Sequence, residues 1–270
     1  FDYYINTEQF KEAALILSQV NFESSSYVIQ PLEIANIFIK CAECSLEDDE
    51  TVDAEVYVNR ASQYMNDITD RHLQLRYRVT SARVLDANRK FLEASLRYYD
   101  LSITTDTEIV QDDLLELLGK AITCVILAKA GPQRTRILAQ INKDDRLGQL
   151  EQLPKYSIHS NVLNKMSNEQ LLRKDELNQF IESLAPHQKA MTSEGFTIPE
   201  KAVIEHNLIA ISKIYENIRF DQLAVLLGMI ESKAEKVSAK MIIEERLKAV
   251  IDQSENLLIF EDDNEQLYRW

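Results

Sequence analysis

The residues that could bind a metal or act as nucleophiles are few and widely separated in this sequence. Cys41 and Cys44 form a C-x-x-C pair, but a structural zinc site needs two further ligands, and the remaining cysteine is Cys124. A redox role for the pair would require a preceding strand in a βαβ unit, and no such strand is predicted. We therefore interpret these cysteines as small buried side chains of a helix in a reducing compartment, and we predict no metal site.

The histidines and glycines give no better support for catalysis. The four histidines form no H-x-H or H-E-x-x-H pair, and five isolated glycines provide no phosphate-binding loop, dinucleotide fingerprint or G-x-S-x-G motif. Glu205 and His206 are adjacent, so they project from different faces of a helix and are poorly placed as an acid–base pair. We predict a non-enzymatic protein without a cofactor, in which His187 and His206 are hydrogen-bonded residues at helix contacts.

Nucleic-acid binding is the third chemistry to weigh, because the last third of the chain has the pattern of a winged helix. A helix-turn-helix over 220–247 is followed by two β-prone runs, 249–252 and 257–260. However, acids and bases cancel in the predicted third helix, 231–247, and duplex affinity depends on Lys and Arg at the phosphates. We favour a winged helix that packs against protein. The DNA-binding alternative would depend on the lysines of the third helix, Lys233, Lys236 and Lys240.

The charge of the whole chain bears on its partners. It has 30 basic and 44 acidic side chains, a formal net charge of −14, which disfavours nucleic acid and anionic membranes and fits a basic protein partner better. The longest apolar run, 121–130, is about half as long as the roughly 20 residues of a bilayer span. Because the chain begins at Phe1 without Met, we expect a fragment of a longer protein.

The elements that position these residues are predicted to be helices. Five glycines and five prolines in 270 residues are too few for a turn-rich β or α/β fold. Within residues 1–150, apolar side chains recur at three- and four-residue spacing, which predicts successive amphipathic helices. The similar runs FKEAALIL at 10–17 and FLEASLRY at 91–98 carry small residues that allow helices to approach closely. Together these features indicate a solenoid of paired helices.

Turn-forming residues predict where some elements end. Gly131 and Pro132 are expected to stop the helix 106–130, with Gly131 in the left-handed conformation. Gly228 is expected to make the turn between the second and third helices of the winged helix. The wing lacks a glycine turn, but Asn256 tolerates a positive φ and makes a hairpin feasible.

A helical-repeat solenoid followed by a winged helix is the architecture of the PCI domain, found in subunits of the proteasome lid, the signalosome and translation initiation factor three. The segment from KAVIEHN at 201–207 to LKAVID at 247–252 resembles this family. Its most characteristic motif is IEHN at 204–207. The runs AGPQRTRILAQINKDDR at 130–146 and PHQKA at 186–190 are more similar to one signalosome subunit than to its paralogue in the proteasome lid.

The resemblance implies a mainly α fold, a right-handed solenoid of TPR-like helical repeats followed by a winged-helix subdomain. The similarity covers about residues 50–261 and is poor at 152–170. We expect four parts: the solenoid at 1–150, linking helices at 151–198, the winged helix at 199–262 and the start of a C-terminal helix or tail at 263–270.

The resemblance also implies a function. It predicts a non-catalytic scaffold subunit of the signalosome, which joins other PCI subunits and metalloprotease-type subunits and helps the complex engage cullin–RING ubiquitin ligases. The metalloprotease, which removes the ubiquitin-like modifier Nedd from cullins, is expected on another subunit. The expected location is the cytoplasm and the nucleus, with no nucleic acid, membrane or cofactor. The alternatives are a scaffold of the proteasome lid and, less favoured, a nucleic-acid-binding regulator.

Partner binding is expected at the apolar run LLIF of the wing. We predict that this run is an exposed edge strand, which would need a partner or a cover. Its alternating side chains point Leu258 and Phe260 to one face and Leu257 and Ile259 to the other.

Overall fold

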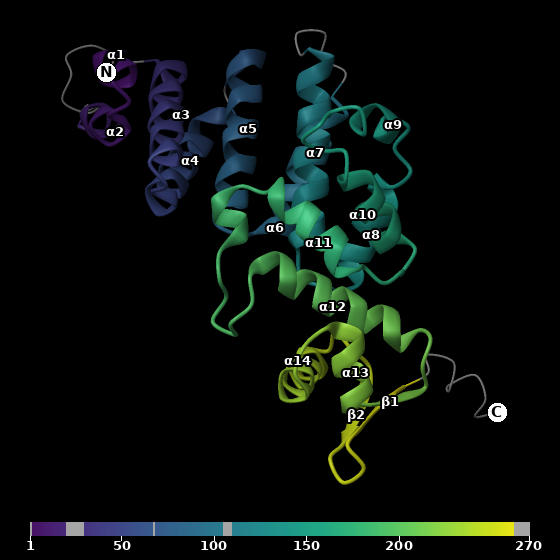
Figure 1. Cartoon of the computed structure of the whole chain (residues 1–270). Coiled ribbons are helices and arrows are strands. Elements are labelled where there is room, and N and C mark those ends of the chain that lie inside the picture. Colours follow the sequence, from purple (N-terminus) through teal and green to yellow (C-terminus); the bar gives the residue numbers. More distant parts are fainter. Residues whose placement is uncertain (1, 20–29, 67, 105–109, 262–270) are drawn as a thin grey trace. The chain divides into compact units, whose positions relative to one another are not determined.

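The computed structural model describes residues 2–19, 30–66, 68–104 and 110–261 (Figure 1). Within these ranges the chain is mainly α-helical, with three short strands, which confirms the predicted fold class. The chain divides into two compact units, Phe1–Ala121 and Ile122–Trp270. No helix of the described ranges is long and apolar enough to cross a membrane.

The first unit consists of helices that pack against their neighbours in the sequence. These are α1 (Asp2–Asn6), α2 (Phe10–Ser18), α3 (Pro31–Glu47), α4 (Thr51–Met65), α5 (Arg71–Ala87), α6 (Phe91–Ser102) and the first part of α7 (Gln111–Leu127). Helix α3 packs against α2, α4 and α5, and α5 packs against α4 and α6. Packing of this kind suits an array of helical repeats, while the right-handed solenoid and the boundaries at 150, 198 and 262 stay predictions.

The two similar runs of the first unit use their small residues as predicted. Ala13 and Ala14 of α2 are buried, as are Ala94 and Ser95 of α6. The Ser95 hydroxyl donates a hydrogen bond to the carbonyl oxygen of Ala121 at 2.9 Å. Small side chains thus lie at the helix contacts, where they let the backbones approach closely.

The second unit begins with the last part of α7, which is followed by a group of short helices. They are α8 (Pro132–Ile141), α9 (Leu147–Leu150), α10 (His159–Ser167), α11 (Lys174–Glu182) and a 3-10 turn η1 (Pro186–Lys189). The predicted left-handed stop at Gly131 is wrong, because its φ of 166° is extended backbone and α7 already ends at Leu127. The pair instead begins α8, since a proline in the first turn has a helical φ and its missing N–H would have no partner there.

The winged helix completes the second unit. It comprises α12 (Ile198–Ser212), β1 (Asn217–Arg219), α13 (Phe220–Leu227), α14 (Glu231–Ile243), β2 (Ala249–Asp252) and β3 (Leu257–Phe260). Both predicted strands are confirmed, and Gly228 and Asn256 adopt positive φ values of 66° and 56° at the predicted turns. One buried cluster holds the module together, and it includes Phe220, Leu223, Val237, Met241, Leu258 and Phe260.

Candidate functional site

The strand predicted to bind a partner lies in the middle of the sheet rather than at its edge. The strand order is β1-β3-β2, and β3 pairs antiparallel with both neighbours. The prediction of an exposed edge at Leu257–Phe260 is therefore wrong, because the short strand β1 covers one side of β3. Among the described residues, the edge strands of the sheet are β1 and β2. A three-residue strand such as Asn-Ile-Arg gives too short a pattern to be recognised in the sequence.

The two faces of β3 agree with the predicted alternation. Leu258 and Phe260 are buried, whereas 41% of Ile259 is exposed and Leu257 is partly buried. Ile259 lies opposite Val250 of β2, and 53% of Val250 is exposed. The outer face of the sheet thus presents a pair of β-branched apolar side chains to the solvent.

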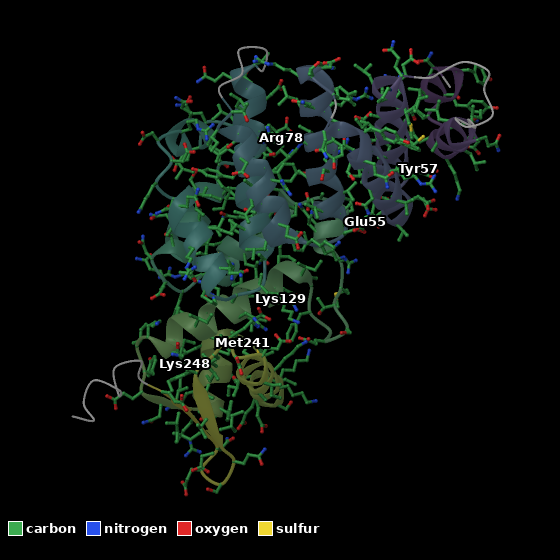
Figure 2. All side chains as sticks on the ribbon, turned by 180° about the vertical axis from the view of Figure 1, so that it is seen from behind. Glu55, Tyr57, Arg78, Lys129, Met241 and Lys248 are labelled. Carbon is green, nitrogen blue, oxygen red and sulfur yellow. The ribbon has the colours of Figure 1, made fainter. Side chains whose placement is uncertain are left out.

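Helix α14 is the element that would read bases in a DNA-binding winged helix. It contacts the wing, the turn between β2 and β3, on one side and the core of the module on another. On the wing side, Gln253 donates to Glu235 at 3.2 Å, and Asn256 donates to Glu231. Met241, labelled in Figure 2, is fully buried against the core. The exposed residues of the helix are Glu231, Ser232, Lys236 and Ile243, so Lys236 is the one exposed basic side chain of α14 suited to reading a base edge. This arrangement disfavours sequence-specific DNA binding.

Glu205, in the IEHN motif at 204–207, belongs to a buried ionic network. Its carboxylate receives hydrogen bonds from both terminal nitrogens of Arg246, at 2.5 and 3.1 Å, and from the backbone N–H of Ala130 at 3.3 Å. Arg246 also donates to the carbonyl oxygen of Ala130 at 3.3 Å. The side chain of Glu205 is 2% exposed and that of Arg246 12%. Helix α12 is thereby fastened to the segment after α7 and to the segment after α14.

The next two residues of the same motif, His206 and Asn207, form hydrogen bonds with the backbone of the segment before α11. His206 Nε2 donates to the carbonyl oxygen of Gln170 at 2.8 Å. The Asn207 amide pairs with the backbone of Leu172, accepting from its N–H at 2.9 Å and donating to its carbonyl oxygen at 3.0 Å. Because successive helix positions face different directions, the polar side chains of 205–207 reach separate segments. We call Glu205, His206, Asn207 and Arg246 the α12 clamp.

A second buried arginine lies near the clamp. Arg134 of α8 donates to the carbonyl oxygens of Val125 and Ile126 at 3.0 and 2.8 Å, at the end of α7 where helix carbonyls lack partners. Burial lowers the pKa of Arg134 to about 10, an effect that the Glu205 carboxylate opposes. The side chain therefore carries its charge at neutral pH, and Glu205 helps to balance two buried guanidinium groups.

Two buried histidines make the second unit sensitive to acid. Burial and the nearby Arg134 charge lower the pKa of His206 to about 4, although the hydrogen bond to Gln170 opposes this shift. Burial and Lys155 lower the pKa of His159 to about 4 as well. The His159 ring lies between those of Tyr156 and Phe180, and its Nδ1 has no hydrogen-bond partner. Both rings are therefore neutral in the folded protein at physiological pH.

Mild acid is expected to destabilise the protein through these two rings. Their folded pKa lies below the ordinary 6.5, so the unfolded chain binds more protons between about pH 6.5 and about pH 4, and stability falls as the pH drops through this window. From about pH 7 to about pH 5, the expected loss is on the order of 2 kcal/mol per histidine. Urea denaturation across this range measures it, and His159→Phe should remove about half of the histidine-dependent slope. An unchanged slope in that variant would contradict the assignment.

The cysteines have the buried, helical role that the sequence indicated. Cys41 and Cys44 lie in α3 and are 0% and 4% exposed. Burial raises the pKa of Cys41 to about 12 and that of Cys44 to about 11, so both are neutral thiols at physiological pH. Among the described residues, no group of three or more His, Cys, Asp or Glu side chains could hold a metal ion.

Comparison with known protein families agrees with this architecture. A family model described as "PCI domain" matches residues 163–262, and one described as "PSMD12/CSN4, N-terminal" matches residues 2–113. The first match covers the whole winged helix and the helices α11 and η1 that precede it. The helical units, the winged helix and these matches define a PCI-domain protein.

Similarity to individual proteins identifies a more specific family within the PCI-domain proteins. The chain is 41% identical over 272 residues to COP9 signalosome complex subunit 4 of Arabidopsis thaliana, covering 99% of this chain and 67% of that protein. It is 44% identical over 269 residues to the subunit of the same name in Dictyostelium discoideum (99% and 65%), and 38% identical over 267 residues to that of Emericella nidulans (96% and 63%). The chain belongs to the family of COP9 signalosome complex subunit 4, and it spans about two thirds of the length of these relatives. These relatives are the signalosome subunit that the runs at 130–146 and 186–190 resembled.

Proposed function

We propose that this chain is a non-catalytic scaffold subunit of a COP9 signalosome that joins other signalosome subunits through its winged helix. The observation that carries the proposal is the identity of 38–44% to subunit 4 relatives over nearly the whole chain. The family model of the PCI domain over 163–262 includes the proposed contact region. The proteasome lid is the second candidate assembly, and the lower similarity of the words at 130–146 and 186–190 to its subunit disfavours it.

The proposal assigns the chemistry to other subunits. A metalloprotease-type subunit removes Nedd from the cullin, and this chain helps the complex engage the cullin–RING ligase in the cytoplasm and the nucleus. The side chains best suited to chemistry support a structural role, because each already serves the fold. Glu205 and His206 belong to the α12 clamp, and Cys41 and Cys44 are buried in α3.

The outer face of the winged-helix sheet is the proposed contact with a neighbouring subunit. Of the four residues predicted for partner binding, Ile259 and Leu257 point to this face, while Leu258 and Phe260 hold the module from within. The partner is expected to cover Ile259 and Val250 and to pair with an open edge strand, β1 or β2. A sheet edge offers backbone hydrogen bonds, and the apolar pair offers area to bury.

Charges on this face are expected to block assembly. Val250→Asp combined with Ile259→Asp should reduce the partner subunits that co-purify with the tagged protein at least about tenfold, since an unpaired carboxylate would be buried in the contact. The two aspartates would lie directly opposite each other on paired strands, so the melting temperature should fall moderately, and a retained cooperative transition shows that the module still folds. Quantitative mass spectrometry of the eluate measures the partners.

A matched control lies on α14. Ile243 is 81% exposed at the end of α14 and belongs to a helix rather than to the sheet, so Ile243→Asp adds the same kind of charge outside the sheet face. It should leave the recovered subunits unchanged. Equal recovery with the sheet variant and the α14 variant would refute the proposed contact.

A further inference from the structure

The segment between η1 and α12 folds into a tight hairpin beside α14. Met191 and Thr197 form an antiparallel bridge, Thr192 N–H donates to the carbonyl oxygen of Phe196 at 2.7 Å, and Ile198 N–H donates to that of Ala190 at 3.1 Å. Gly195, at the tip, has a φ of 76° that suits glycine. Figure 1 shows the chain turning back between η1 and α12 on the side of the winged helix where α14 lies. We call residues 190–198 the hairpin.

The hairpin engages two lysines of α14 with two different groups. The Glu194 carboxylate pairs with Lys240 of α14 and, at 2.8 Å, with Lys201 of α12. The Phe196 ring lies 4.7 Å below the ammonium of Lys233, a cation–π contact. Phe196 also packs against the core of the winged helix, which fixes the hairpin in place.

The lysines of α14 form a stripe that could otherwise meet a polyanion. Lys233, Lys236 and Lys240 are spaced by three and four residues, so they follow one side of the helix. The acids Glu231 and Glu235 of the same helix are held by the wing through Asn256 and Gln253. Glu244, just after the helix, pairs with Arg246 at 2.7 Å and lies 4.0 Å from Lys240. Without the hairpin, α14 would therefore present three lysines along one side, with Glu244 still near Lys240.

We infer that the hairpin is an intramolecular guard that closes the lysine stripe of α14 to nucleic-acid phosphates. The Glu194 carboxylate occupies the position at Lys240 that a phosphate would take. The Phe196 ring covers the Lys233 ammonium, which would otherwise contact a second phosphate. Non-specific duplex affinity comes from the number of phosphates that lysines neutralise, so engaging two of three lysines removes most of it. The guard is formed within the second unit of this chain and does not depend on the proposed assembly.

Opening the hairpin is expected to create nucleic-acid binding. Glu194→Gln combined with Phe196→Ala should bind a fluorescein-labelled duplex of about 20 base pairs at least about tenfold more tightly than the unmodified protein at low salt. With three phosphates contacted, log Kd should change with log salt by about three units per decade. Fluorescence anisotropy titrations at several salt concentrations measure both quantities. Lys240→Gln added to this variant should remove most of the gain.

Two further variants keep the test decisive. Glu216→Gln makes the same change in net charge at an exposed position outside the hairpin, and it should not increase binding. If Phe196→Ala abolishes the melting transition, the Glu194→Gln single variant decides the question, because it keeps the packing of Phe196. Binding no tighter than that of Glu216→Gln by a folded hairpin variant would overturn the inference.

Discussion

Glu205→Ala is expected to lower the free energy of unfolding by about 3–5 kcal/mol, the usual cost of breaking a buried ion pair. The substitution leaves the largely buried Arg246 without its bidentate partner and removes the acceptor of the Ala130 N–H. It also removes a carboxylate that favours the charged form of the buried Arg134. Urea denaturation monitored by circular dichroism measures the change.

Two controls separate the buried charge from the loss of any carboxylate. Glu216 is exposed, so Glu216→Ala should change the stability by less than about 0.5 kcal/mol. Replacing both partners, in Glu205→Leu with Arg246→Met, should cost less than Glu205→Ala alone, because Arg246 is no longer left buried without its partner. The remaining cost includes the loss of the Glu205 carboxylate near Arg134. A Glu205→Ala protein as stable as Glu216→Ala would show that the α12 clamp does not hold the second unit together.

Leu258→Ala is expected to cost about 2–5 kcal/mol, the range for truncating a large aliphatic side chain in a core. Leu258 is fully buried on the central strand of the winged-helix sheet, where a cavity would be enclosed by well-packed neighbours. Loss of the module should also reduce the recovery of partner subunits, as a consequence of unfolding. Thermal and urea denaturation measure the primary effect.

The adjacent residue provides the matched comparison. Ile259→Ala removes a similar number of atoms from the opposite face of the same strand, where 41% of the side chain is exposed. It should cost less than about 1 kcal/mol, since little transfer from water is reversed. Equal destabilisation by the two substitutions would contradict the assignment of Leu258 to the core and Ile259 to the outer face.

Local patterns were enough to predict most of the winged helix. The change from helical spacing to β-rich runs placed β2 and β3 at 249–252 and 257–260, and Gly228 and Asn256 marked turns that require positive φ. These features depend on residues close together in the sequence. One further local signal was available, the capping box of Thr197 and Glu200, which marks the start of α12.

The position of β3 within the sheet could not be predicted in the same way. An apolar run predicts a strand, but whether that strand is central depends on the strands that pair with it. Here the decisive strand is β1, three residues long and about 40 residues earlier in the chain. The predicted edge was wrong for this reason, although the predicted faces of the strand were right.

The α12 clamp also depends on contacts between residues far apart in the sequence. The adjacency of Glu205 and His206 correctly argued against an acid–base pair, because the two side chains face different partners. It could not identify Arg246, which is 41 residues later, or the backbone of Leu172. Charged and polar residues in an otherwise apolar helix were the available signal, since such groups are buried only when they are bonded.

The central claim, a scaffold role in a signalosome, is tested most directly by purifying the protein from its native cells. The tagged protein is isolated under mild conditions, its partners are identified by mass spectrometry, and the same eluate is assayed for removal of Nedd from a modified cullin. If the chain is a signalosome scaffold, signalosome subunits should be recovered with it and the eluate should remove Nedd from the cullin. Recovery of proteasome-lid subunits without that activity, or of nucleic acid without either complex, would contradict it.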